Sequence, residues 1–310
     1  MRKCWRKLLR VLSYNAFLIM LTGTYTAIVT PFKRGQFDTK AFKQLIDQQV
    51  KGGVDGIVPV GTTGESPTVN YQEHIEIIAK AAEFARGRIH VMAGTGGNST
   101  SEAVYLTQAA EKAGADSSLQ VAPYYNKPSQ EGLFQHFMEV SRSTKLPIIL
   151  YSIPSRCGVE IAVETVHRLA AASPKIVGIK EAGGNPDRVS QLRAKLGKRF
   201  AIFSGDDALT LPFMSVGAHG VISVASNIIP KQVSQMVAAF SKGDTARALK
   251  LHEQYYPIFK DLFIETNPVP VKTALAMMNL CSEECRLPLV AMSPKNRDIL
   301  RATLKNCGVV

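Results

Sequence analysis

The sequence predicts an α/β protein with the architecture of a (β/α)8 TIM barrel and a small C-terminal helical extension. Three observations support this prediction. The chain has 310 residues, 45% of them hydrophobic, which is enough for the core of one barrel. Short apolar runs alternate with amphipathic segments about every 30 residues, the length of one βα step. Eight such runs are present, and no Gly-rich dinucleotide-binding turn follows the first of them.

The expected strands occupy residues 23–29, 56–60, 90–93, 118–122, 148–151, 176–180, 201–204 and 220–224. Helical periodicity is strong between them, for example at 39–51, 71–85, 99–113, 130–143 and 163–172. After the eighth strand the pattern is wholly helical, at 231–240, 245–263, 269–279 and 294–305. We therefore divide the chain into an N-terminal extension (1–20), a barrel (21–230) and a helical extension (231–310).

The formal net charge of +12 does not indicate a nucleic-acid-binding protein. Five basic residues lie in the first ten positions, and the other +7 is scattered among the expected helices. The basic and apolar start resembles a signal peptide, but no small-x-small cleavage site follows it. We favour an upstream start codon with Met20 as the natural start, and a targeting or membrane-surface peptide is the alternative. No apolar run reaches the ~20 residues that span a bilayer, so we expect a cytoplasmic protein without a membrane partner.

The cysteine pattern predicts neither a disulfide framework nor a metal site. The number of cysteines is odd and no C-x-x-C pair is present; they are Cys4, Cys157, Cys281, Cys285 and Cys307. Cys281 and Cys285 are four residues apart, but without neighbouring histidines we interpret them as small buried hydrophobic residues. No HExxH motif or acidic cluster suggests a metal, and a reduced compartment fits this pattern best.

The active site of a barrel lies at the C-terminal ends of the strands, so the polar residues there are the first candidates. Lys180 ends the sixth expected strand above an apolar floor, which would lower the pKa of its amine and make it a nucleophile. Its position alone does not exclude a lysine that reaches water or pairs with Glu181. Tyr151 ends the neighbouring strand, where its phenol is either a proton carrier or a buried hydrogen-bonding group.

Two further loops suggest recognition of carboxylates. The turn at 61–64 combines two glycines with Thr62 and Thr63, which suits a nest of backbone N–H groups, although a plain loop is the alternative. Arg156 can form a bidentate pair with a carboxylate or can simply be solvated. Asp206 and Asp207 follow the seventh strand, where many barrels bind phosphate, and would repel it. Carboxylate substrates are therefore favoured over sugar phosphates.

These residues fall in motifs that resemble the dihydrodipicolinate synthase/N-acetylneuraminate lyase superfamily. In chain order the motifs are GTTGES at 61–66, AGTG at 93–96, PYYNKPSQEG at 123–132, YSIPSR at 151–156, GIKE at 178–181 and SGDD at 204–207. The likeness extends from about Leu21 to the C-terminus. It implies a condensation of pyruvate with aspartate 4-semialdehyde that gives 4-hydroxy-tetrahydrodipicolinate, the first committed step of lysine (diaminopimelate) biosynthesis. It implies no cofactor, because the intermediate is a covalent pyruvyl-lysine imine on Lys180.

The resemblance also implies roles for individual residues. Thr62, Tyr151 and Tyr125 would form a proton relay, with Tyr125 reaching the neighbouring subunit's site in a homotetramer. The substrates would be held by Thr63, Arg156, Gly205 and Ile222. Lysine-inhibited members of the superfamily carry a pocket at the same dimer interface, and its residues here would be Ser66, His74, Asn98, Glu102 and Tyr124. We therefore expect feedback inhibition by lysine, although Pro67 and Tyr71 depart from the usual pattern.

Two other departures and two rival functions complete the expectations. Cys157 stands where threonine is common, beside a cation that would lower its pKa, or it is a harmless small residue. Gln120 lies inside the fourth strand, and the sequence does not say which face it occupies. A sibling aldolase, such as N-acetylneuraminate lyase or a keto-acid aldolase or dehydratase, would retain Lys180 and Tyr151. A non-catalytic regulator that binds a keto acid is the rival of a different class.

Overall fold

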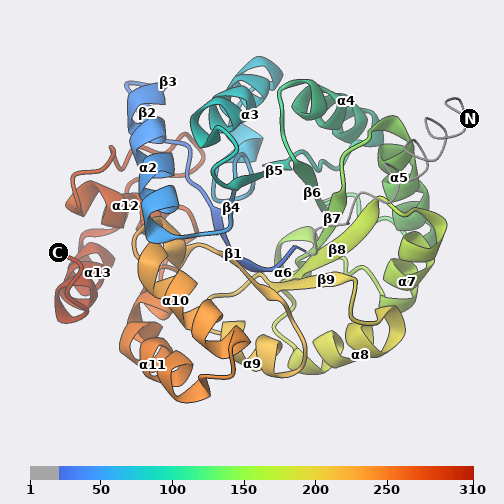
Figure 1. Cartoon of the computed structure of the whole chain (residues 1–310). Helices are drawn as coiled ribbons and strands as arrows, with labels where there is room; N and C mark the ends of the chain where they lie inside the picture. The colour runs from blue at the N-terminus through green and yellow to red at the C-terminus, as the bar shows by residue number, and fades with distance from the viewer. Residues whose placement is uncertain (1–20) are drawn as a thin grey trace, which may run out of the picture.

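The computed structural model describes residues 21–310, so the predictions for residues 1–20 and for Cys4 lie outside the described residues. Eight parallel strands close into a barrel surrounded by helices, as Figure 1 shows. They are β1 (Gly23–Ala27), β4 (Gly56–Val58), β5 (His90–Gly94), β6 (Ser117–Val121), β7 (Ile148–Ser152), β8 (Ile176–Glu181), β9 (Ala201–Ser204) and β10 (Gly220–Ser223). β1 pairs with both β4 and β10, which closes the barrel and confirms the predicted fold class.

The helices form a ring in which each packs against the next, and α10 returns to contact α2 and β1. The ring consists of α2 (Thr39–Gly52), α3 (Tyr71–Ala85), α4 (Thr100–Lys112), α5 (Gln130–Ser143), α7 (Val163–Ala172), α8 (Pro186–Leu196), α9 (Thr210–Ser215) and α10 (Pro230–Ser241). In the C-terminal part of the chain, α11 (Thr245–Asp261) packs against α10, and α13 (Pro294–Asn306) packs against both α11 and α12 (Val269–Met277). α10 completes the ring, although the sequence analysis assigned residues 231–240 to the extension. The domain division at residue 230 stays a prediction.

Local capping contacts fix where the ring helices begin. Asp38 caps α2 by accepting the Ala41 N–H, and Asn70 caps α3 by accepting the N–H groups of Gln72 and Glu73. The side chains of Ser99, Ser129 and Asn185 cap α4, α5 and α8 in the same way. Each cap satisfies N–H groups that the first turn of a helix leaves without partners. The starts of these five helices are therefore encoded in short stretches of sequence.

Strand alternation separates two apolar layers and settles the position of Gln120. Leu119 belongs to the cluster inside the barrel, whereas Gln120 is fully buried on the opposite face of β6. The Gln120 amide Nε2 lies 2.7–2.8 Å from the hydroxyl oxygens of Thr95, Thr107 and Ser118. The amide therefore packs towards α4, which carries Thr107, and takes no part in the barrel interior.

The loops after β1 and β4 begin earlier than the sequence predicted. β1 ends at Ala27 and β4 ends at Val58, each two residues before the expected end. Ala27 and Val58 form the last residue pair between these two strands. Val60 then adopts a left-handed conformation with φ 52°, which no strand accommodates. An antiparallel hairpin, β2 (Phe32–Lys33) with β3 (Gln36–Phe37), and a short helix, α6 (Pro154–Cys157), were not predicted.

Within residues 21–310, no helix is both long enough and apolar enough to cross a bilayer. The same part of the chain gathers no group of three or more His, Cys, Asp and Glu side chains that could hold a metal ion. The cytoplasmic location stays a prediction.

Barrel closure requires glycine at position 220. Gly220 has φ 149° and pairs with Gly23, and a Cβ atom at 220 would lie 1.9 Å from the Gly23 carbonyl oxygen. We expect Gly220→Ala to lower the free energy of unfolding by about 3 kcal/mol or more, because both strain and a backbone clash oppose it. The control is Gly243→Ala, which has φ 83° but open space around it and should cost only about 1 kcal/mol. Equal losses in thermal denaturation would contradict this account.

Candidate active site

The strand ends bring most of the predicted catalytic residues into one cavity of about 50 Å³. Lys180 on β8 and Tyr151 on β7 are direct partners in the sheet register. Thr62 and Thr63 come from the loop after β4, and Gly205 follows β9. Arg156 from α6 and apolar side chains of the barrel interior also line the cavity. Residues up to 143 positions apart in sequence thus meet at the barrel mouth because parallel strands end at the same edge.

The amine of Lys180 is buried, and its environment favours the neutral form. The side chain is only 6% exposed, and Nζ lies 4.3 Å from the centroid of the Tyr151 ring. Burial lowers the pKa of Lys180 to about 8; Asp207 opposes this shift and Arg156 adds to it. About a tenth of the amines are then neutral at pH 7, whereas about one in three thousand would be neutral at the ordinary pKa of 10.5.

The alternative in which Lys180 pairs with Glu181 is wrong. Glu181 points to the opposite face of β8, where its carboxylate accepts from Arg188 Nε at 2.7 Å and from the Gly183 N–H at 2.8 Å. Both Glu181 and Arg188 are buried, so this ion pair lies between the barrel and its helices. Lys180 is left facing the cavity.

Gly205 and Asp207 shape the space around the lysine. A Cβ atom at position 205 would lie 3.0 Å from Lys180 Cε and 2.6 Å from the Ala182 side chain, so glycine leaves room for the lysine. The buried Asp207 carboxylate accepts from the Ser223 hydroxyl and from the N–H groups of Val224 and Ala225 at 3.0 Å. Asp207 therefore fixes the loop after β10, a role that the sequence analysis did not assign.

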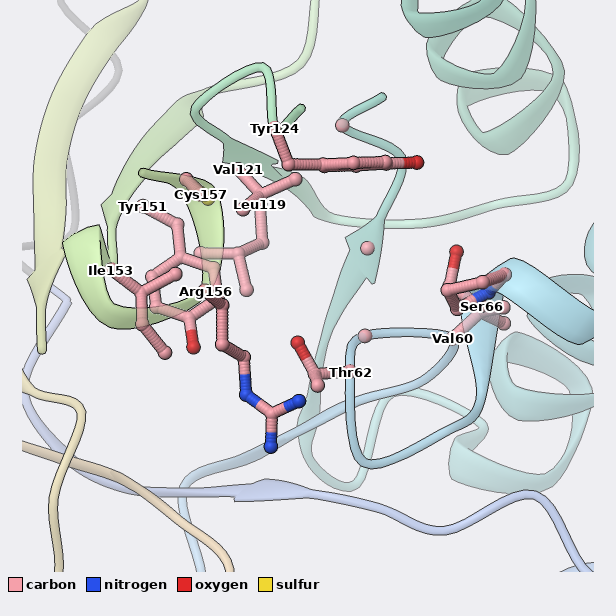
Figure 2. Close-up of a pocket in the computed structure, with 14 residues that line it drawn as sticks. Val60, Thr62, Ser66, Leu119, Val121, Tyr124, Tyr151, Ile153, Arg156 and Cys157 are labelled. Atoms are coloured by element: carbon pink, nitrogen blue, oxygen red, sulfur yellow. The ribbon is translucent and has the colours of Figure 1, made fainter. Parts of the chain in front are cut away.

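Tyr151 provides a protonated phenol beside the amine. Burial raises the pKa of Tyr151, while the charge of Arg156 and a hydrogen bond with Thr62 act in the opposite direction. The phenol therefore keeps its proton at neutral pH and can donate it. Figure 2 shows Tyr151, Thr62 and Arg156 around one open space, with Tyr124 and Ser66 on its far side.

Two residues of the cavity come from the C-terminal extension and were missed. Asn267 Nδ2 donates to the Thr63 hydroxyl at 3.0 Å, and the Asn267 carbonyl accepts from Arg156 Nη2 at 3.4 Å. Phe263 also lines the cavity. Both follow α11 and lie far from the barrel motifs in sequence, so periodicity gave no signal for them. The only hint was the break in the helical pattern at Asn267-Pro268.

Two predicted site residues lie outside this cavity. The Tyr125 side chain is 90% exposed, and its backbone is left-handed with φ 73°. Ile222 is fully buried and belongs to the apolar cluster inside the barrel that also includes Tyr151 and Phe203. The roles of Tyr125 and Ile222 stay predictions.

A second pocket, of about 600 Å³, brings together the residues predicted to bind lysine. Ser66, His74, Glu102 and Tyr124 line it, and Asn98 Nδ2 donates to the Tyr124 carbonyl at 3.3 Å. Burial lowers the pKa of His74 to about 4, so this histidine is neutral at pH 7. The departures Pro67 and Tyr71 line the same pocket.

The pocket of Figure 2, about 210 Å³ in volume, lies between the catalytic cavity and the second pocket. It shares Thr62, Tyr151 and Arg156 with the former and Ser66 and Tyr124 with the latter. The two predicted sites are therefore neighbours on one face of the barrel.

The suggestion that Arg156 activates Cys157 is wrong. Cys157 is 2% exposed, and burial raises the pKa of its thiol to about 11, although the charge of Arg156 acts in the opposite direction. Burial outweighs the neighbouring cation because the thiolate loses nearly all its hydration. The alternative, a small buried residue, is the better description.

A (β/α)8 barrel with a buried lysine of lowered pKa at its mouth has the architecture of an imine-forming barrel enzyme. The sequence profile of the dihydrodipicolinate synthetase family matches residues 20–307. The 4-hydroxy-tetrahydrodipicolinate synthase of Persephonella marina is 51% identical over 292 residues, which cover 94% of this chain and 100% of that protein. The chain belongs to the dihydrodipicolinate synthetase family, as its motifs predicted.

Solved structures agree with this assignment. The 4-hydroxy-tetrahydrodipicolinate synthase of Methylacidiphilum fumariolicum SolV is 58% identical with a TM-score of 0.92, over 93% of this chain and 96% of that one. A relative from Cyanidioschyzon merolae, solved with lysine bound, is 38% identical with a TM-score of 0.91, over 94% of this chain and 99% of that one. These similarities confirm the fold over nearly all the described residues.

The lowered pKa of Lys180 predicts the pH dependence of its reaction with pyruvate. Only the neutral amine attacks a carbonyl, so the rate of imine formation should rise with pH and level off above about 8. Arg156→Met removes a charge that lowers this pKa, so the midpoint should move to higher pH. Rapid-mixing measurements with pyruvate alone test this without involving the second substrate. A midpoint that stays in place or falls would contradict the electrostatic account.

Proposed function

We propose that the protein condenses pyruvate with L-aspartate 4-semialdehyde to give 4-hydroxy-tetrahydrodipicolinate, the first committed step of lysine biosynthesis. The observation that carries this proposal is the pairing of a buried amine of lowered pKa with a protonated phenol at the mouth of the barrel. The family membership and the names of the relatives support the choice of substrates.

The reaction begins with attack of the neutral Lys180 amine on the keto carbon of pyruvate. Loss of water gives the imine, and loss of a proton from its methyl carbon gives an enamine. That carbon then forms a bond with the aldehyde carbon of the semialdehyde. The amino group of the product displaces Lys180 as the ring closes, which regenerates the free lysine. No cofactor is needed, because the protonated imine accepts the electron pair that the methyl carbon releases.

Each proton transfer needs a group close to the amine, and Tyr151 is placed for this task. Thr62 links the phenol to the turn after β4. Thr63, with the backbone at Gly205 and Ile222, holds the pyruvyl group. Arg156 binds the carboxylate of the semialdehyde at the mouth, where a guanidinium can form two parallel hydrogen bonds.

A coupled assay distinguishes this reaction from those of sibling enzymes. We expect turnover with pyruvate and aspartate semialdehyde, and little cleavage of N-acetylneuraminate, because Arg156 in the cavity lining suits the small dicarboxylate product better than a long sugar acid. Arg156→Lys should retain the charge but lose the bidentate geometry, which should reduce kcat/KM for the semialdehyde about tenfold or more. Turnover of a sugar acid instead would assign the protein to a sibling activity, and no turnover of either would support a binding protein.

Tyr125 completes the proton relay in a neighbouring subunit, and the active form is a homotetramer. Its extreme exposure and the apolar lining of the pocket in Figure 2 support this role, since a large aromatic side chain is rarely left in water. That pocket opens onto Thr62 and Tyr151, which the phenol of a second copy would have to reach.

Mixing two inactive variants tests the shared site. Tyr125→Phe and Tyr151→Phe should each lose most activity as pure proteins. Subunit exchange should restore part of it, because some sites then combine the intact Tyr151 of one chain with the intact Tyr125 of another. A mixture with no more activity than its components, although an affinity tag on one variant co-purifies the untagged other, would place Tyr125 outside the relay.

Lysine binds the second pocket and inhibits the reaction. The carboxylate of Glu102 can pair with an ammonium group, and Asn98 and Tyr124 lie beside it. The relative solved with lysine bound supports this proposal. A titration of activity with lysine tests it: Glu102→Gln should weaken inhibition about tenfold or more, because one charge-assisted hydrogen bond is lost. Wild-type enzyme that is indifferent to millimolar lysine would contradict the proposal.

A further inference from the structure

The turn that carries Thr62 and Thr63 is held in a strained shape. Val60 and Glu65 flank it, and both are left-handed, with φ 52° and 57°, a conformation that side chains with a Cβ atom rarely adopt. The N–H groups of Gly64 and Glu65 bond back to the carbonyls of Gly61 and Thr62 at 3.0 and 3.1 Å. Such a turn persists only when the surrounding structure fixes it.

The fixing contacts come from the C-terminal extension. Lys272 on α12 forms an ion pair with Glu65, and both side chains are fully buried. The other Glu65 carboxylate oxygen accepts from the Arg286 N–H at 2.9 Å, so the carboxylate is held from two sides. Lys272 Nζ also lies 4.5 Å from the centroid of the Phe32 ring, which confines the ammonium.

A second contact from the same extension reaches the turn directly. Asn267, which lies five residues before Lys272, donates to the Thr63 hydroxyl at 3.0 Å. Its carbonyl accepts from Arg156, so the extension touches both groups that would hold substrate carboxylates. The extension thus contacts the turn on both sides of Gly64: Asn267 bonds to Thr63, and Lys272 bonds to Glu65.

A buried ion pair of this kind is weak evidence for stability. The free energy lost when two charges leave water offsets much of their attraction. Apolar side chains of similar volume therefore often stabilise a protein equally well. An ion pair is directional, whereas an apolar contact is not. The Glu65 carboxylate can bond to both the Lys272 ammonium and the Arg286 N–H in only one orientation. This requirement fixes where the turn lies relative to the barrel.

We propose that Glu65 and Lys272 are positioning residues. Through this ion pair, the C-terminal extension holds the turn so that Thr62 and Thr63 face the cavity that contains Lys180. The inference rests on the proposed function and assigns the extension a part in the reaction. Loss of the pair lets the turn shift, so that the Thr62 hydroxyl leaves Tyr151 and the Thr63 hydroxyl leaves the pyruvate carboxylate.

The test uses the double variant Glu65→Gln/Lys272→Met in the full-length protein, which removes both charges and leaves no unpaired one. The control removes a partly exposed ion pair of the same extension, Glu283→Gln/Arg297→Gln. Thermal denaturation, borohydride trapping of the pyruvate adduct, and kcat and KM for each substrate are measured. We expect the test variant to fold and to form the adduct, with KM for pyruvate raised and kcat reduced about tenfold or more. The control should match the wild type.

The pH profile separates positioning from electrostatics. Burial, Asp207 and Arg156 set the pKa of Lys180, and neither Glu65 nor Lys272 is among these causes. The midpoint near pH 8 should therefore stay in place while the rate falls. A test variant that folds and keeps kcat and KM within about twofold of the wild type would overturn the proposal.

Two outcomes need a second measurement. If the double variant does not fold, Asn267→Ala takes its place, and it should raise KM for pyruvate through Thr63. If the wild type forms the adduct but does not turn over the semialdehyde, the proposed reaction fails separately. The rate and affinity of imine formation with pyruvate then still decide whether the extension positions the turn.

Discussion

The burial of one lysine amine at the end of β8 is the constraint on which the rest of the site depends. Strand alternation turns Lys180 into the barrel and Glu181 out of it, where Arg188 neutralises the carboxylate. Gly205 leaves the volume that the lysine stem needs. A side chain at 205, or a carboxylate facing inward at 181, would disturb the amine. The alternation of side chains along β8 and the glycine that follows the neighbouring strand β9 therefore create the buried amine that we propose as the nucleophile.

Burial and two neighbouring charges act on the pKa of Lys180 in opposing directions. Desolvation is the largest effect and lowers the pKa of Lys180, and Arg156 adds to it across the cavity. Asp207 opposes both, but three hydrogen bonds hold its carboxylate in the loop after β10. Desolvation also raises the pKa of Tyr151, so at neutral pH a protonated phenol lies beside an amine of which about a tenth is neutral. When the amine is neutral, neither of the two groups carries a charge, and the amine is then free to attack a carbonyl.

The sequence predicted the barrel because each βα step carries its own periodic signal, and the polar residues at strand ends followed from that pattern. For this reason, one cavity brings together Lys180, Tyr151, Thr62, Thr63, Arg156 and Gly205. The sequence could not predict the ion pair of Glu65 with Lys272 or the contact of Asn267 with Thr63, because these join segments about 200 residues apart. The direction of the pKa shift of Cys157 could not be read from the sequence, because depth of burial, which outweighs the neighbouring Arg156, has no local signature. The proposed role of Tyr125 requires a second copy of the chain, so this role stays a prediction.

Intact-protein mass spectrometry after borohydride reduction in the presence of pyruvate tests the central claim most directly. The wild type should gain the mass of one reduced pyruvyl group per chain, and Lys180→Ala should gain none. Lys43→Ala, which removes an exposed amine on α2, is the control and should react like the wild type. An adduct that persists in Lys180→Ala, or a wild type that forms none, would contradict the assignment of Lys180 as the nucleophile.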